Sequence, residues 1–311
     1  MAINTVWQKE LAPVKQFKLG LIADEASQDI EEAAALARSY GATGLEIRTV
    51  FGKQLPELTE EDLDRIKATL NKHRMVCCGI SSPFFKCQPE EADEHLKLLD
   101  DYIRVAKALG TDRIRGFAFW KKPDRPFEEV LPVIKEKLTE AAAKLRKAGM
   151  ILLLENEPST YDTDAAAIVR IVEAVGLPEI QALWDPGNDI YTATREVPYP
   201  DGYGLLRPWI GHVHIKDAKR NEDDRPISVR FGDGVVDYVG QFNALSDEGY
   251  TGWLVLEPHY RSKALSEEQL MNPGGFDFSS GGMRATAECF EQVLRFFKER
   301  GYSVKDEVGG N

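Results

Sequence analysis

Eight short apolar runs alternate along the chain with longer amphipathic stretches. Each run is almost continuously hydrophobic, which fits parallel strands that are buried on both faces. The stretches between them repeat apolar residues at helical spacing. The runs lie at residues 18–24, 43–50, 75–81, 112–119, 150–156, 179–185, 210–216 and 252–258. This alternation predicts strand–helix units and a parallel sheet.

Local signals bound several of the helical stretches. We expect Ser27 to cap the first of these helices and Gly41 to follow its end. Asp62 follows Thr59 by three residues, a pattern close to a capping box. Pro132 is expected near the first turn of its helix or at a kink. The helix after the sixth run has the weakest signal, because only DGYGLLRPW is available to form it.

Eight such units favour a closed barrel over an open, doubly wound sheet. The predicted fold class is α/β, a single (β/α)8 TIM barrel over residues 1–311, and a barrel of this kind needs about 250 residues. No GxGxxG or GxxxxGK[ST] motif indicates a nucleotide-binding fold. Residues 261–282 are an irregular excursion after the eighth strand, either a lid or an oligomer contact. Residues 303–311 are expected to be a frayed tail.

Four acidic or imidazole side chains stand at the ends of the last four predicted strands. They are Glu155 in LLLENE, Asp185 in LWDPGN, His214 in HVHIKD and Glu257 in LVLEPHY. The carboxyl ends of barrel strands meet at one face, where the catalytic groups of such barrels gather. Three carboxylates and one imidazole suit one divalent metal ion, with Mn²⁺, Mg²⁺, Co²⁺ and Zn²⁺ all acceptable. The alternative for each carboxylate is an ion pair with a nearby Arg or Lys.

The HVHIKD motif offers two histidines on one face of a strand, and either could bind metal. His214 lies nearer the carboxyl end of the strand and is the predicted ligand. His212 is expected one layer deeper, as a packed or hydrogen-bonded core histidine.

The motifs LLLENE, LWDPGN, HVHIKD, FGDGVVDY and GYTGWLVLEPHY resemble those of the xylose isomerase-like TIM barrels, the superfamily of sugar-phosphate isomerases and epimerases. The resemblance covers most of the chain and is strongest from residue 150 to residue 260. It implies that Glu155, Asp185, His214 and Glu257 bind a divalent metal. It also implies that Glu155 and Glu257 form the acid/base pair, and that Arg220 contacts substrate hydroxyls. Ketose 3-epimerases place a His where this chain has Asn188, which can hydrogen-bond a hydroxyl but does not titrate.

Further polar residues near the strand ends are candidates for substrate binding. Lys86, Lys216 and Arg115 could bind a phosphate or carboxylate group, and Glu46 and Arg48 alternate with apolar residues on the second strand. For the basic residues, a salt bridge inside the barrel or at its surface is the alternative. Glu157 and His259 share a strand face with Glu155 and Glu257. We therefore expect these two to contact the ligands or the substrate.

Composition and charge exclude several kinds of partner. The net charge of −12 disfavours broad binding to nucleic acid or to an anionic membrane, and no apolar run approaches the length of a membrane-spanning helix. The first sixteen residues lack the apolar core of a signal peptide, so we expect a cytoplasmic protein. Four cysteines without a CxxC pair indicate reduced, buried thiols. The expected partner is a small sugar or sugar phosphate, and a homo-oligomer is possible.

These features predict a metal-dependent sugar or sugar-phosphate isomerase or epimerase that acts through an enediolate intermediate. An inosose-type dehydratase would use similar metal and acid/base groups. The further alternatives are an endonuclease IV-like DNA repair enzyme, which needs more histidine ligands than this chain offers, and a non-catalytic sugar-binding barrel.

Overall fold

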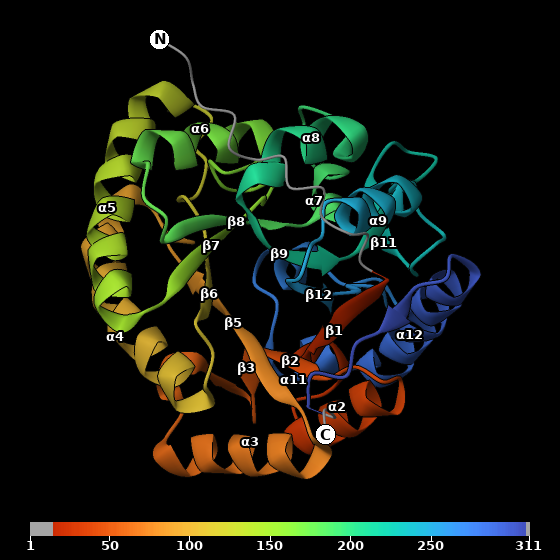
Figure 1. Ribbon diagram of the computed structural model, residues 1–311. Coiled ribbons are helices and arrows are strands. Elements are labelled where there is room, and N and C mark those ends of the chain that lie inside the picture. The colour runs from red at the N-terminus through yellow and green to blue at the C-terminus, as the bar shows by residue number, and fades with distance from the viewer. Residues whose placement is uncertain (1–14, 309–311) are drawn as a thin grey trace.

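A closed barrel of eight parallel strands forms the centre of the molecule in the computed structural model, which describes residues 15–308 (Figure 1). The barrel strands are β1 (Gln16–Ile22), β2 (Gly44–Ile47), β5 (Val76–Phe84), β6 (Arg113–Gly116), β7 (Ile151–Glu155), β8 (Ile180–Trp184), β9 (Ile210–Ile215) and β12 (Trp253–Leu256). Each strand pairs with the next along the chain. The barrel closes where Leu19 of β1 lies opposite Leu254 of β12. The predicted (β/α)8 barrel is confirmed.

Helices surround this barrel as an outer layer (Figure 1). They are α2 (Ile30–Ser39), α3 (Glu60–His73), α4 (Ala92–Leu109), α5 (Phe127–Ala148), α6 (Ala165–Val175), α8 (Tyr203–Leu206), α9 (Tyr238–Asp247) and α12 (Gly282–Glu299). Their apolar faces cover the outer side of the strands and form one large core with them. The position after the sixth barrel strand, β8, has the shortest helix. There α7 (Pro186–Asp189), a turn at Pro198–Gly202, α8 and a turn at Arg207–Trp209 replace one regular helix.

The sequence predicts the ends of the helices only in part. The Thr59 and Asp62 capping box is present at the start of α3. The expected cap at Ser27 is wrong, because Asp29 caps α2 and its side chain accepts from the Glu31 amide. Ser27 instead ends the short helix α1 (Ala23–Ala26), where its amide donates to the Ala23 carbonyl. Pro132 lies past the first turn of α5, and the helix continues through it.

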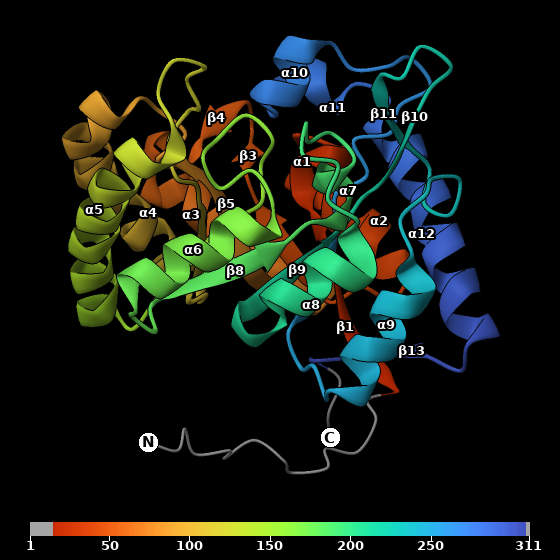
Figure 2. The ribbon, with the colours of Figure 1, turned by 90° about the horizontal axis from the view of Figure 1, so that it is seen from above.

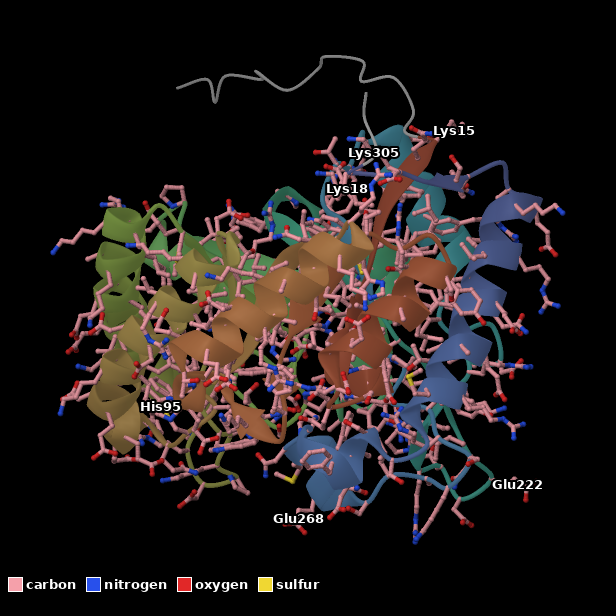
Figure 3. The ribbon with its side chains drawn as sticks, turned by 90° about the horizontal axis from the view of Figure 1, so that it is seen from below. Lys15, Lys18, His95, Glu222, Glu268 and Lys305 are labelled. Atoms are coloured by element: carbon pink, nitrogen blue, oxygen red, sulfur yellow. The ribbon has the colours of Figure 1, made fainter. Side chains whose placement is uncertain are left out.

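The carboxyl ends of the barrel strands open to one end of the molecule. The hairpins β3 (Thr49–Val50)–β4 (Lys53–Gln54) and β10 (Asp217–Arg220)–β11 (Pro226–Val229) lie at this end with α7, as Figure 2 shows. Figure 3 marks the same end by Glu222 and Glu268, and the opposite end by Lys15, Lys18 and Lys305. The expected site residues therefore belong to the end that carries the hairpins.

The two segments expected to be irregular are more ordered than the sequence indicates. Residues 261–282 form α10 (Glu267–Met271) and α11 (Gly275–Ser279), and they lie over the carboxyl end of the barrel (Figure 2). The expectation of a tail frayed from residue 303 is wrong for its first part. β13 (Ser303–Val304) pairs with β1, and the Lys305 amide donates to the Phe17 carbonyl.

Some expectations fall on residues that the structure does not describe. The amino-terminal segment up to residue 14, on which the expected cytoplasmic location rests, and residues 309–311 lie outside the described residues. Within residues 15–308, none of the helices combines the length and the apolar character needed to cross a membrane. All four cysteines are buried and free, as expected.

A buried carboxyl group in the loop after β7 makes the stability of the barrel depend on pH. Asp162 accepts from the Ala118 amide at 3.0 Å, and its burial raises its pKa from 3.8 to about 8. Between about pH 4 and pH 8 the folded state therefore holds a proton that the unfolded state has lost, so the free energy of unfolding falls as pH rises. We expect Asp162→Asn to reduce this fall, measured by urea unfolding at pH 5, 6.5 and 8. If the free energy of unfolding of Asp162→Asn fell with pH as steeply as that of the parent protein, the prediction would be wrong.

Candidate metal centre and active site

Barrel closure brings the four predicted metal-binding residues together. Glu155 ends β7, Asp185 follows β8, His214 lies near the end of β9, and Glu257 follows β12. One donor atom from each lies within 4.8 Å of the donor atoms of the others, and all four residues are buried. His214 Nδ1 lies 3.2 Å from Glu155 Oε1 and 3.4 Å from Glu257 Oε2. Such a set surrounds a position that one cation could occupy.

The strand-to-helix turn after β8 fixes the Asp185 side chain. Its Oδ1 accepts from the amides of Gly187 and Asn188 as the N-cap of α7. The Asn156 side chain donates to the Asp185 carbonyl and accepts from its amide. Oδ2 is in contact with the Lys216 ammonium at 2.7 Å. A metal ion would share this carboxylate oxygen with Lys216.

Glu46, a carboxylate outside the set of four donors, orients the imidazole ring of His214. Glu46 on β2 lies with Oε1 3.2 Å from His214 Nε2 and Oε2 2.7 Å from His212 Nε2, and the Ser81 hydroxyl also donates to it. This contact leaves Nδ1 of His214 facing Glu155 and Glu257. A carboxylate on the far ring nitrogen is the usual way in which a protein orients a metal-binding histidine. His212 occupies the deeper position expected of it.

Three buried cations neutralise part of the negative charge. Lys216 Nζ lies 2.7 Å from Asp185 Oδ2 and 2.9 Å from Glu257 Oε2. Arg115 pairs with Glu155 at 3.0 Å, and Arg48 pairs with Glu257 at 2.8 Å. Each ligand carboxylate is therefore also in an ion pair, which was the alternative weighed for these residues from the sequence.

Arg48 extends the buried charges towards the first strand. Its guanidinium also pairs with Asp24 and Glu25, the two acidic residues of α1. His259 Nε2 lies 3.1 Å from Glu25 and 3.5 Å from Glu257. Arg261 contacts Glu25 from the other side, at 3.3 Å. The carboxylate of Glu257 thus belongs to a network that spans β12, β2 and the end of β1.

This described network carries more negative than positive charge. It contains six buried carboxylates and four buried cations, so two negative charges remain when the imidazoles are neutral, the form in which His214 would bind a metal ion. The carboxylates belong to Asp24, Glu25, Glu46, Glu155, Asp185 and Glu257, and the cations to Arg48, Arg115, Lys216 and Arg261. Burying unbalanced charge is costly. One divalent cation at the four donors would restore neutrality, so the residues present fit such an ion.

The pKa values of the donors follow from this competition between burial and neighbouring charge. Burial opposes ionisation of Glu257, but Lys216, His259 and His214 outweigh it and hold its pKa well below the usual value. Burial raises the pKa of Asp185 to about 7, against the opposing effect of Lys216. Burial favours the neutral form of His214, yet Glu46 and Glu257 raise its pKa well above the usual value. Positive neighbours thus lower the pKa of Glu257, burial raises that of Asp185, and carboxylates raise that of His214.

A cavity of about 840 Å³ opens above these donors. Its lining residues are Lys86, Arg115, Phe117, Glu155, Glu157, Pro158, Ser159, Asn188, Tyr191, Lys216, Asn221, Arg225, Pro226, Ile227, Ser228, Val229, Glu257, His259, Tyr260, Arg261, Ser262, Ala264, Leu265, Leu270, Met271 and Pro273. Glu155 and Glu257 both face it. Two of the four donor residues are therefore accessible to a small molecule, whereas Asp185 and His214 lie behind the lining residues of the cavity.

Most of the predicted substrate-binding residues line this cavity. Asn188, Lys216, Glu157, His259 and Lys86 do so. The side-chain NH2 group of Asn188 donates to the Asn156 backbone carbonyl, and Lys86 pairs with Glu157 at 3.2 Å.

Two of the predicted contacts are placed differently. Arg48 is not among the lining residues, and its guanidinium donates to Glu257 Oε1 at 2.8 Å. Arg220 is not among the lining residues. Its guanidinium donates to the carbonyls of Ile190, Thr192 and Asp224 and holds the β10–β11 hairpin against the barrel. The Asp224 carbonyl lies in the hairpin turn, whereas those of Ile190 and Thr192 lie in the segment after α7. A direct substrate contact by Arg220 stays a prediction.

Asp24 and Glu25 are the site residues that the sequence did not single out. The expected first strand ends in IAD, so an acidic residue after an apolar run was the available signal. The same signal identified Asp185 and Glu257. The outer lining from β11 and α10 carries no motif of its own.

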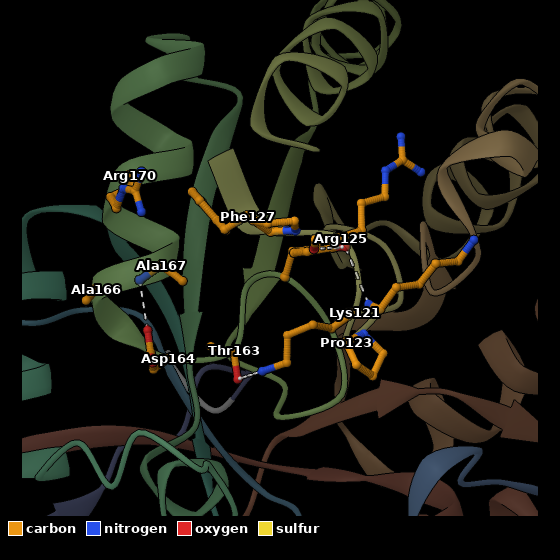
Figure 4. A pocket seen from close by; sticks show the side chains of 12 residues that line it. Lys121, Pro123, Arg125, Phe127, Thr163, Asp164, Ala166, Ala167 and Arg170 are labelled. Carbon is orange, nitrogen blue, oxygen red and sulfur yellow. Dashed lines mark hydrogen bonds between the residues drawn. The ribbon is translucent and has the colours of Figure 1, made fainter. Parts of the chain in front are cut away.

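A second cavity, of about 640 Å³, lies in the outer layer beside the start of α6 (Figure 4). Asp164 caps this helix through the Ala167 amide, and Lys121 lies 3.3 Å from the Thr163 hydroxyl. Arg125 pairs with Glu90 and Arg170 with Glu128, so these cations are already neutralised. This cavity brings together no acid/base pair.

Three comparisons with known proteins place this chain. The model of the xylose isomerase-like TIM barrel family matches residues 34–301. An inosose dehydratase of Klebsiella pneumoniae is 30% identical over 139 residues, which cover 40% of this chain and 44% of that protein. The chain thus matches less than half the length of that relative.

Solved structures agree on the fold. The D-psicose 3-epimerase of Clostridium cellulolyticum, determined with D-tagatose, has a TM-score of 0.71 and 17% identity, covering 92% of this chain and 100% of that one. The 3-keto-D-glucoside 4-epimerase of E. coli has a TM-score of 0.65 and 16% identity, covering 91% and 100%. At these identities the likeness concerns the barrel alone. Because the family model spans all the barrel strands after the first, the chain belongs to the xylose isomerase-like TIM barrel family.

Proposed function

We propose that this protein is a metal-dependent enzyme acting on sugars, an isomerase or epimerase that removes and returns a proton next to a carbonyl group. The observation that carries the proposal is the donor set of Glu155, Asp185, His214 and Glu257 at the inner end of the cavity, with two negative charges unbalanced. The names of the structural neighbours, which are sugar epimerases, point the same way.

Glu155, Asp185, His214 and Glu257 would hold a divalent ion, which would supply a Lewis acid that makes a C–H bond next to a carbonyl group more acidic. The chain itself supplies the proton transfer. Lys216 lies 2.9 Å from Oε2 and holds Glu257 ionised, the form in which a carboxylate can accept a proton. Glu155 is oriented by Arg115 and offers the second carboxyl group. Return to the opposite face gives an epimer, and delivery to the neighbouring carbon gives an aldose–ketose isomer.

Asn188, Lys86 and Glu157 line the cavity with hydrogen-bonding groups suited to sugar hydroxyls. Asn188 does not titrate, so its role is limited to orientation. Lys216 lies between two carboxylates and keeps its charge, because Asp185 and Glu257 outweigh its burial and raise its pKa well above the usual value.

Dehydration of an inosose-type substrate is the second candidate, favoured by the relatives named inosose dehydratase. The same proton abstraction would be followed by loss of a hydroxyl group. His259 lines the cavity 3.5 Å from Glu257 and is placed to protonate that leaving group. The endonuclease alternative has less support, since only one histidine stands among the four donors.

The test is a screen for solvent deuterium uptake. Protein loaded in turn with Mn²⁺, Mg²⁺, Co²⁺ or Zn²⁺ is incubated in D₂O with ketoses, phosphoketoses and inososes. We expect metal-dependent incorporation at the carbon next to the carbonyl, detected by NMR. The product then distinguishes epimerisation, isomerisation and dehydration. Bound metal and bound sugar without any exchange would instead indicate a non-catalytic sugar-binding barrel.

A further inference from the structure

The cavity has two ends of different chemistry. Its inner end is charged and contains Glu155, Glu257 and Lys216. Its outer wall comes from β11 and from the segment that contains α10, and that wall is mainly apolar. Its apolar members are Pro226, Ile227, Val229, Ala264, Leu265, Leu270, Met271 and Pro273. Figure 2 shows that α10 and the β10–β11 hairpin lie at the same end of the barrel.

The cavity is larger than a free monosaccharide requires. Its volume of about 840 Å³ falls in the upper part of the range of roughly 300–1,000 Å³ that is usual for drug-sized ligands. A free sugar chelated at the inner donors would leave the apolar wall facing water. Met271 is 45% exposed, and covering such a side chain with an apolar group is favourable. The wall therefore fits a second, apolar part of the ligand.

The charges of the cavity disfavour a phosphate group as that second part. Lys86 is paired with Glu157, Lys216 with Asp185 and Arg115 with Glu155. Among the described lining residues, Arg225 is the cation whose side chain makes no ion pair or hydrogen bond, and it is exposed. One exposed guanidinium is a weak phosphate site, whereas its flat face can stack on an aromatic ring.

We propose that the substrate is a keto sugar that carries an apolar substituent, with the sugar at the inner donors and the substituent against the β11–α10 wall. This inference rests on the proposed function. A sugar linked to an apolar group through its anomeric carbon is an acetal there, so the carbonyl must lie on another ring carbon. The substrate class is thus a keto-glycoside. The reaction that supplies it is a dehydrogenation of a ring alcohol in the parent glycoside, which passes two electrons and two protons to an acceptor.

The test compares four probes on the metal-loaded protein: a phenyl keto-glucoside, a methyl keto-glucoside, a free ketohexose and a ketose phosphate. Affinity is measured by calorimetry, and deuterium exchange is measured separately. We expect the phenyl compound to bind about tenfold more tightly than the methyl compound, in line with the effect of apolar groups in enzyme pockets. An octyl keto-glucoside shows whether the wall requires an aromatic ring or any apolar group.

Single substitutions in the apolar wall test whether it causes the tighter binding of the phenyl compound. Met271→Gln and, separately, Leu270→Gln should remove most of the phenyl advantage and leave methyl keto-glucoside binding unchanged. Val235→Ser is the matched control, since Val235 is apolar and 64% exposed but does not line the cavity. It should leave both affinities unchanged.

The outcomes separate this inference from the proposed function. Tight phenyl binding that depends on Met271, without exchange of any probe, keeps the apolar subsite and overturns the reaction. Exchange of the free ketose with no phenyl advantage keeps the reaction and overturns the subsite. Preference for the ketose phosphate overturns the subsite too. So does self-association that Met271→Gln abolishes, because a second copy would then be the group that covers the wall.

Discussion

Metal-loaded Glu155→Gln and Glu257→Gln proteins are expected to lose turnover by about a hundredfold to ten-thousandfold, the usual contribution of a positioned acid or base. Each replacement keeps the shape of the side chain but removes a carboxylate that can exchange a proton. The measurement is the initial rate of product formation on the substrate identified by deuterium uptake. Glu222→Gln is the control, because Glu222 is an exposed carboxylate at the same end of the barrel (Figure 3).

Solvent exchange should distinguish the two glutamates. A residue on one face of the substrate can remove and return its own proton even when its partner is absent. Exchange should therefore survive, if at all, in only one of the two variants. Metal occupancy must be measured in each, since both residues are also proposed ligands. Metal-loaded variants with near-native rates would rule out the two-glutamate mechanism and turn attention to His259 as the base, since Lys216 keeps its charge.

Asp185→Ala is expected to abolish stoichiometric metal binding. The replacement removes one of the four donors and leaves Lys216, which lies 2.7 Å from Asp185 Oδ2, as an added positive charge beside the metal position. Equilibrium dialysis followed by elemental analysis measures the effect. The same variant should lose the rise in melting temperature that metal gives the parent protein, because an ion that binds only the folded state stabilises it.

Asp233→Ala provides the comparison for that experiment. Asp233 is a partly exposed carboxylate that pairs with Arg230 on the turn before α9, so its loss changes the net charge equally without touching the donors. It should bind metal as the parent does. Full metal occupancy and activity in Asp185→Ala would show that the ligand assignment is wrong.

The strands and the four donors could be predicted because both leave local signals. A parallel strand covered on both faces is apolar along its whole length, and a polar residue directly after such a run stands at the carboxyl end of the barrel. Asp185 and Glu257 were found in this way. The same rule would have found Asp24, had the acidic residue after the first strand been given equal weight.

Contacts across the barrel leave no such signal. Glu46 and His214 are 168 residues apart, and their contact arises only because β2 and β9 face each other across the closed barrel. Arg220 shows the opposite case, in which a family pattern suggested a substrate contact. Its side chain instead satisfies three backbone carbonyls of neighbouring loops. Hydrogen bonds that form only once the hairpin folds are not visible in residue spacing.

The division of the cavity between strand ends and loops has a consequence for evolutionary divergence. The proton-transferring residues sit on the barrel, where most substitutions would disturb a shared network of buried charges. The outer wall comes from two surface segments, and several of its side chains, Met271 among them, are exposed. Mutations there cost little stability and change which molecules fit. Descendants of this protein could therefore acquire new substrates while inheriting the same reaction.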